Sequence, residues 1–152
     1  MGARAAPPAA QKKSAEVVIE ADELWSYVGK KREEWWVWVA LDARTRQVVA
    51  MVCGDRSERT ARCLWDALPD AYRDGAVVAT DFLAAYRAVV PAERHAAAGK
   101  EAGLTAHVER FWLTVRQRCG RFVRKTLSFS KCAENHVGAL WDFIRYYNAS
   151  LR

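Results

Sequence analysis

Apolar and polar residues alternate over the first half of the chain in a way that predicts β-strands. Val17, Ile19 and Ala21 are apolar with polar residues between them, and residues 35–42 are rich in the β-branched and aromatic side chains that suit a buried strand. The predicted strands are residues 16–28, 35–42 and 47–53, with a charged turn at 30–34 and a polar turn at 44–46. Because these connections are short, the three strands are expected to form an antiparallel meander.

The period of the apolar residues changes near residue 57 to three or four positions, which predicts amphipathic helices. Ser57 can cap the first helix, and Pro69 ends it. The short apolar run 76–80, which stops at Asp81, is typical of a strand buried on both faces. The remaining predicted elements are a helix at 82–90, an edge strand at 94–98, a loop at 99–105, a long helix at 106–123, a break at 128–130 and a last helix around 137–147.

This order is three strands, a helix, a strand, a helix, a strand and two helices, which is the order of a ribonuclease-H-like α/β domain. The sheet of such a domain is mixed, with three antiparallel strands followed by a helix and a parallel strand, and helices cover both faces. A length of 152 residues suits one domain, which is expected to span 16–152. Residues 1–15 are predicted to form a disordered tail.

Composition excludes several classes of protein. Apolar residues make up 51% of the chain, which excludes a disordered or collagen-like polypeptide. No apolar run approaches the roughly 20 residues of a membrane-spanning helix, and the start of the sequence lacks the apolar stretch of a secretory signal. The four cysteines have no CxxC or CxxH spacing, so a zinc site is not predicted and buried thiols in a reducing cytoplasm are expected.

The net charge of +6 is concentrated in one segment. Residues 109–131 contain seven basic side chains and one acidic side chain, so the net charge of this segment equals the net charge of the whole chain. Aromatic residues alternate with these cations, which favours a surface that binds nucleic acid through its phosphates, although a solvated basic helix face is the alternative. The residues predicted to contact DNA are Lys100, Arg116, Arg118, Arg121, Arg124, Lys125 and Lys131.

Three acidic residues interrupt apolar surroundings: Asp22 in the first strand, Asp81 after the fourth and Glu109 near the start of the long helix. If the first and fourth strands are neighbours, the three carboxylates can converge, with Arg116 two helical turns beyond Glu109. Convergent carboxylates can hold two divalent cations, and magnesium suits oxygen ligands beside a phosphate. Taken singly, each acid could instead cap a turn or complement a helix dipole.

Four segments resemble the InsB-type transposases of the insertion sequence one family: DELWSYVGKK at 22–31, TDFLAAY at 80–86, GKEAGLTAHVERFWLTVRQR at 99–118 and RKTLSFSK at 124–131. The similarity extends from about residue 20 to the C-terminus. It implies a DDE transposase in which Asp22, Asp81 and Glu109 are catalytic and bind two magnesium ions, or manganese. Arg116 matches the basic position after the glutamate, and His107 is expected to contact a metal ligand or a phosphate.

The resemblance also implies the reaction. Water activated by metal would nick DNA at the ends of the element, and the freed 3′-hydroxyl would attack target DNA. The zinc-finger and helix-turn-helix region of the family is expected upstream, as a fusion or a partner, and joining two ends suggests a homo-oligomer on DNA. The protein is expected in the bacterial cytoplasm, associated with the nucleoid. The alternatives are a non-catalytic DNA-binding remnant or regulator, and a ribonuclease-H-like nuclease or resolvase that only hydrolyses.

Overall fold

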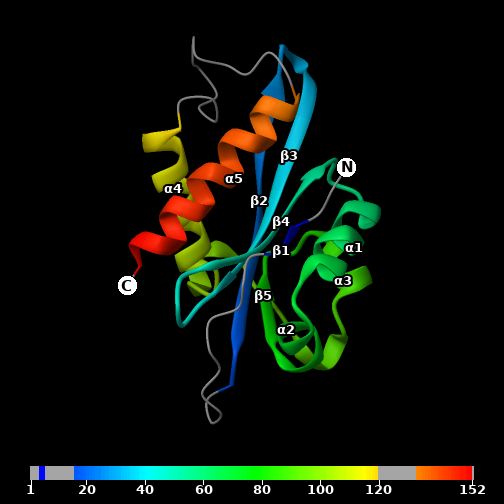
Figure 1. Ribbon diagram of the computed structural model, residues 1–152. Coiled ribbons are helices and arrows are strands. Elements are labelled where there is room, and N and C mark those ends of the chain that lie inside the picture. Colours follow the sequence, from blue (N-terminus) through cyan, green and yellow to red (C-terminus); the bar gives the residue numbers. More distant parts are fainter. Residues whose placement is uncertain (1–3, 6–15, 120–132, 152) are drawn as a thin grey trace.

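The computed structural model describes residues 4–5, 16–119 and 133–151. In these ranges six strands form one sheet in the order β1-β4-β3-β2-β5-β6 (Figure 1). The pairs β1–β4, β4–β3 and β3–β2 are antiparallel, whereas β2–β5 and β5–β6 are parallel. The strands are β1 (Arg4–Ala5), β2 (Val18–Val28), β3 (Lys30–Asp42), β4 (Val48–Gly54), β5 (Val77–Thr80) and β6 (His95–Ala97). This mixed sheet confirms the predicted ribonuclease-H-like α/β fold.

The helices cover both faces of the sheet and enclose two apolar cores (Figure 1). On one face, α1 and α3 pack over Ile19, Ala21 and Trp38. On the other face, α4 and α5 pack over Leu24 and Val39. The helices are α1 (Glu58–Ala67), α2 (Asp70–Gly75), α3 (Ala84–Val89), α4 (Ala106–Arg118) and α5 (Ala133–Ser150), with 3-10 turns η1 (Ala92–Arg94) and η2 (Lys100–Ala102).

The predicted turn at 30–34 is wrong, because these residues belong to β3. The hairpin turns at Gly29, whose φ of 73° lies in the left-handed region that glycine adopts without a steric penalty. Residues 30–34 are exposed, so their polar side chains carry no burial pattern that marks a strand. Helix α2 was not predicted from the sequence; it follows Pro69 directly and places the Tyr72 hydroxyl 2.9 Å from Asp42 Oδ2.

Two predicted segments are described only in part. Of residues 1–15, Arg4–Ala5 pairs with β4, and the others lie outside the described residues. The long helix predicted at 106–123 is α4, which ends at Arg118, and residues 120–132 lie outside the described part of the chain. The last helix begins at Ala133, earlier than predicted, and continues to Ser150.

The expectation of buried thiols is correct for one of the three described cysteines. Cys53 is buried, Cys119 is half-buried and Cys63 is exposed, and Cys53 and Cys63 are free thiols. Cys132 lies outside the described residues. None of the helices in the described ranges is both long and apolar enough to cross a membrane.

Candidate metal and DNA-binding site

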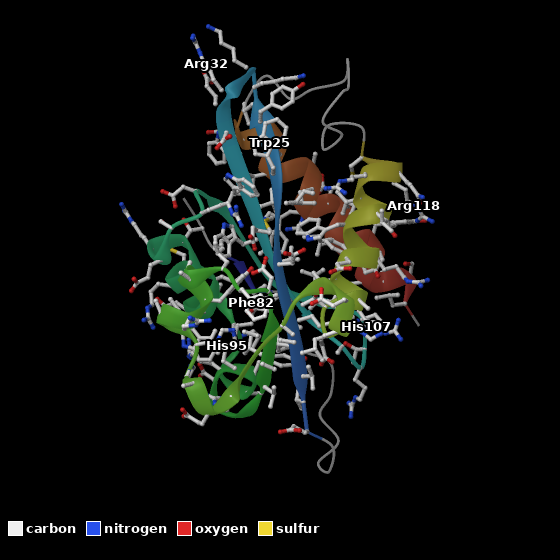
Figure 2. All side chains as sticks on the ribbon, turned by 180° about the vertical axis from the view of Figure 1, so that it is seen from behind. Trp25, Arg32, Phe82, His95, His107 and Arg118 are labelled. Carbon is white, nitrogen blue, oxygen red and sulfur yellow. The ribbon has the colours of Figure 1, made fainter. Side chains whose placement is uncertain are left out.

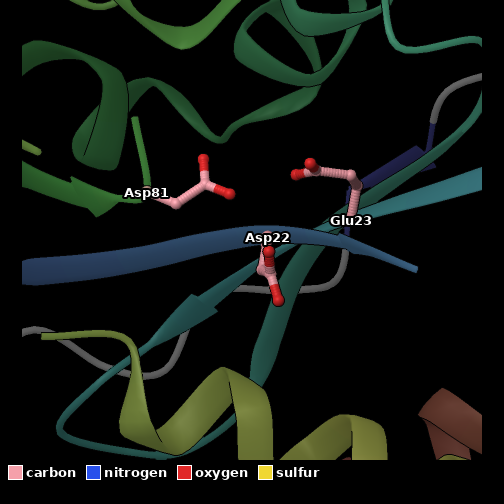
Figure 3. Close-up of side chains that lie close together, drawn as sticks. All are labelled: Asp22, Glu23 and Asp81. Atoms are coloured by element: carbon pink, nitrogen blue, oxygen red, sulfur yellow. The ribbon is translucent and has the colours of Figure 1, made fainter. Parts of the chain in front are cut away.

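Strand β2 presents acidic side chains to both faces of the sheet. Side chains alternate along a strand, so Glu20 and Asp22 lie on the face that Leu24 shares with α4, whereas Glu23 lies on the opposite face with α3. Figure 3 shows Asp22 directed toward the helix below the strand and Glu23 directed away from it. Both faces of β2 therefore contribute a carboxylate near the same point.

Asp81 joins this group from the neighbouring strand. It directly follows β5, which pairs in parallel with β2 through Ile19 and Val78. Its Oδ1 atom accepts a hydrogen bond from the backbone N–H of Leu83 at 3.0 Å, which fixes the carboxylate at the end of the strand. The carboxylates of Asp22, Glu23 and Asp81 each offer an oxygen, and these three atoms lie within 4.8 Å of one another (Figure 3).

Glu109 lies outside that close group but lines the same cleft. It is half-buried in the first turn of α4, where the Thr105 hydroxyl donates a hydrogen bond to its Oε1 atom at 3.0 Å. The cleft has a volume of about 380 Å³. Its lining residues are Asp22, Glu23, Leu24, Trp36, Arg56, Asp81, Glu109, Trp112, Leu113 and Arg116. The three predicted catalytic acids and Arg116 thus share one cleft.

Glu23 is a residue of the cleft that was not predicted from the sequence. The Glu23 side chain is 3% exposed, and its two oxygens accept hydrogen bonds from Arg56 Nη2 at 2.8 Å and from the Tyr86 hydroxyl at 2.7 Å. Burial raises the pKa of Glu23 above its ordinary value of 4.5, and the negative charge of Asp81 adds to this rise, although the two hydrogen bonds oppose it. Glu23 directly follows Asp22 in the sequence DEL, and this pair of adjacent acids could have indicated a second carboxylate at the site.

Tyr86 remains a hydrogen-bond donor to Glu23. Burial, followed by the nearby charge of Glu23, raises the pKa of Tyr86 well above its ordinary value, so the phenol stays protonated. Because Tyr86 also packs edge-on against Trp38 in the core, with ring centroids 5.2 Å apart, it links the acidic group to the packed interior.

A second buried carboxylate fixes the position of α4. Glu20 is 1% exposed, and its Oε1 atom accepts hydrogen bonds from the backbone N–H groups of His107 at 2.8 Å and Val108 at 3.2 Å. Its Oε2 atom lies 2.5 Å from His107 Nδ1. A carboxylate at this place satisfies free N–H groups of the first helical turn and complements the helix dipole. His107 therefore contacts Glu20, and it is not among the residues that line the cleft.

The predicted DNA-contacting residues are described in part. Arg116 lines the cleft, and Arg118 is exposed at the C-terminal end of α4 (Figure 2). Lys100 lies in η2, but its side chain is outside the described part of the structure. Arg121, Arg124, Lys125 and Lys131 lie outside the described residues.

Comparison with known proteins supplies a family resemblance. Residues 15–148 match the family described as IS1 transposase. The iso-IS1n protein InsB of Shigella dysenteriae is 36% identical over 128 residues, which are 84% of this chain and 94% of the relative. The IS1 protein InsB of Shigella sonnei is 35% identical with the same coverage, and the IS1 4 protein InsB of Escherichia coli (strain K12) is 35% identical over 84% of this chain and 74% of its own length.

Proposed function

Because this chain belongs to the IS1 transposase family, we propose that it carries the metal-dependent site that cleaves the ends of an insertion element and joins them to target DNA. The observation that supports this proposal is the shared cleft, in which Asp22, Asp81 and Glu109 lie beside Arg116. The acids come from two adjacent strands and a helix, and a cation on the same helix is available to a polyanion.

The donor set fits hard divalent cations. Each proposed ligand is a carboxylate, and oxygen ligands suit magnesium and manganese. The oxygens of Asp22 and Asp81 lie within 4.8 Å of each other, so their mutual repulsion favours a bound cation. We propose that Asp22, Asp81 and Glu109 hold two such ions. When bound, the ions would polarise the phosphodiester and stabilise the charge that develops on the leaving oxygen.

The reaction proceeds in two displacements at phosphorus. In the first, a water oxygen attacks the phosphodiester at the element end, and the bond to the 3′-oxygen breaks to release a 3′-hydroxyl. In the second, this hydroxyl attacks a target phosphodiester, so one P–O bond forms as another breaks. Arg116 binds the negatively charged phosphate in both steps, and no covalent bond to the protein forms.

Substitution of Asp81 by Asn tests the metal site. Labelled element-end DNA is incubated with magnesium and the chain, alone or fused to an end-recognition region, and the products are separated on a denaturing gel. Asp81→Asn is expected to lower the cleavage rate by at least about a hundredfold, because a ligand charge is lost while the shape is kept. Asp74→Asn, an exposed acid on α2, is the matched control and should cleave at the normal rate.

The products distinguish this proposal from its rivals. Joined strand-transfer products support the transposase. Cleavage without joining supports a nuclease or resolvase that only hydrolyses, and a gel shift without cleavage supports a DNA-binding remnant. Normal cleavage by Asp81→Asn would contradict the metal site.

End recognition and assembly are further proposals. Phosphate contacts position DNA but carry no sequence information, and the cationic residues at the cleft suit that role. We propose that a zinc-finger and helix-turn-helix region, fused to this chain or present as a partner, recognises the ends. Joining two ends to one target further suggests that several copies act together.

A further inference from the structure

We propose that Arg56 is a second phosphate-binding residue of the cleft, which acts together with Arg116. The inference rests on the proposed function, because it takes the cleft to hold DNA. Arg56 lies in the turn between β4 and α1, whereas Arg116 lies on α4, and both line the same cleft. Arg56 was not among the residues predicted from the sequence to contact DNA.

The turn that carries Arg56 is held by hydrogen bonds. The Asp55 carboxylate accepts from the backbone N–H of Ser57 at 3.0 Å and from the Thr60 hydroxyl at 2.7 Å, and its backbone carbonyl accepts from Trp38 Nε1 at 2.9 Å. Hydrogen bonds from Ser57 and Thr60 also lower the pKa of Asp55. A Cβ atom on Gly54 would meet Thr60 Oγ1 at 2.7 Å, so the turn packs closely against α1. Arg56 therefore extends from a fixed base.

The guanidinium itself is held on two sides. Its Nη2 atom donates to Glu23 Oε1 at 2.8 Å, and its central carbon lies 4.6 Å from the centre of the Trp36 ring. Arginine has five N–H donors, and the bond to Glu23 uses one of them. The Arg56 side chain is 43% exposed, and among the described residues it makes no second hydrogen bond. Donors therefore remain for a ligand in the cleft.

The charges that line the cleft explain why Arg56 would help it to bind a phosphate. Four carboxylates line the cleft against two arginines, so a bare polyanion would be repelled from the acidic side. Glu23 and Trp36 hold the Arg56 guanidinium next to the carboxylates before DNA binds. This lowers the conformational entropy that the Arg56 side chain loses when it binds a phosphate. Cations on separate elements can contact successive phosphates of one strand and so align the scissile bond.

The test measures DNA affinity without the chemical step. The full chain is titrated into fluorescent duplex DNA in EDTA at several salt concentrations. Each phosphate contact contributes about 0.9 to the slope of log affinity against log salt. Arg56→Gln and Arg116→Gln are each expected to lower the slope by about 0.9 and to weaken binding roughly eightfold at about 0.1 M salt. Arg56→Lys, which keeps the charge, should retain most of the slope.

Matched variants separate the possible outcomes. Arg59→Gln removes an exposed cation from the first turn of α1, away from the cleft lining, and should leave the slope unchanged. If Arg116→Gln lowers the slope and Arg56→Gln does not, the inference is overturned while the proposed function stands. If neither variant changes the slope, the inference is overturned, and the cleavage assay with Asp81→Asn in magnesium decides the proposed function separately. Thermal melting identifies a misfolded Arg56→Gln, in which case Arg56→Met, which keeps the apolar stem without the charge, decides: a slope lower by about 0.9 supports the inference, and an unchanged slope overturns it.

Discussion

At the scale of single residues, histidines connect the site to the sheet. His95, at the start of β6, places its Nε2 atom 2.6 Å from the hydroxyl of Thr80, the residue before Asp81. That hydroxyl is also 2.7 Å from the backbone carbonyl of Asp81 and can donate to it. Figure 2 shows His95 on the opposite side of β2 from His107. Each histidine thus supports an element that carries a proposed catalytic acid, although neither lines the cleft.

His95 gives the fold a predictable pH dependence. Burial, followed by the positive charge of Arg87, lowers the pKa of His95 below its ordinary value of 6.5. As the pH falls below 6.5, the unfolded chain takes up the proton before the folded chain does, so stability is lost. We expect the free energy of unfolding of the wild type, relative to His95→Gln, to fall as the pH is lowered from about 7.5 to 5.5.

Urea unfolding of both proteins at matched pH values measures this difference. Groups that are unaffected by the substitution cancel in the comparison. A difference that stays constant, or that grows as the pH falls, would contradict the assigned direction.

At the scale of elements, β2 both anchors α4 and supplies the site. Glu20 holds the first turn of α4 through two backbone N–H groups and His107. Without this carboxylate, buried donors at the start of the helix would lack a partner. Because Glu109 lies two residues after His107, the same contact sets the position of a proposed metal ligand.

Substitution of Glu20 is therefore expected to affect both stability and activity. Glu20→Ala should lower the free energy of unfolding by about 3 kcal/mol, because it removes a buried, hydrogen-bonded charge and leaves its partners unsatisfied. Urea unfolding gives this value, and the cleavage assay should show a parallel loss at temperatures where the variant is folded. Glu16→Ala, an exposed acid just before β2, should change stability by less than about 0.5 kcal/mol. Equal stability of the two variants would refute the anchoring role.

Elements with a strong burial pattern could be predicted from the sequence. The strands expected at 35–42, 47–53 and 76–80 lie within or close to β3, β4 and β5, because their apolar side chains face the two cores. The exposed half of β3 carried no such pattern. Pro69 was interpreted as a helix end, which is correct for α1, but the same residue precedes α2.

At the scale of the whole molecule, the site depends on contacts between residues far apart in the sequence, which a local sequence pattern cannot predict. Asp22, Asp81 and Glu109 could be selected because each interrupts an apolar segment, and the family resemblance selected the same residues. Arg56 and Tyr86 could not be selected in this way, because they are separated from Glu23, to which they donate hydrogen bonds, by 33 and 63 positions in the sequence. Their contacts exist only because β2 is central in the sheet, with helices on both faces.

The proposed division between cleavage by this chain and end recognition by a second region leads to a prediction about DNA affinity. The chain on its own should bind element-end DNA and a scrambled duplex of equal length with affinities within about twofold, since phosphate contacts are independent of sequence. Fusion to the end-recognition region should create a preference of at least about tenfold for the ends. Competition binding at one salt concentration measures both ratios. A tenfold preference by the chain alone would locate end recognition within this domain.

The alternation of side chains along β2 limits where residues can be inserted or deleted without disrupting the site. Glu20 and Asp22 are two residues apart on one face, and Glu23 faces the other way. A single inserted residue between Glu20 and Asp22 would exchange the faces of everything beyond it, even if the hydrogen-bonded ladder reformed. We therefore expect insertions and deletions among descendants of this sequence to occur at the exposed end of the β2–β3 hairpin. The number of residues between Glu20 and the acids Asp22 and Glu23 is expected to stay the same.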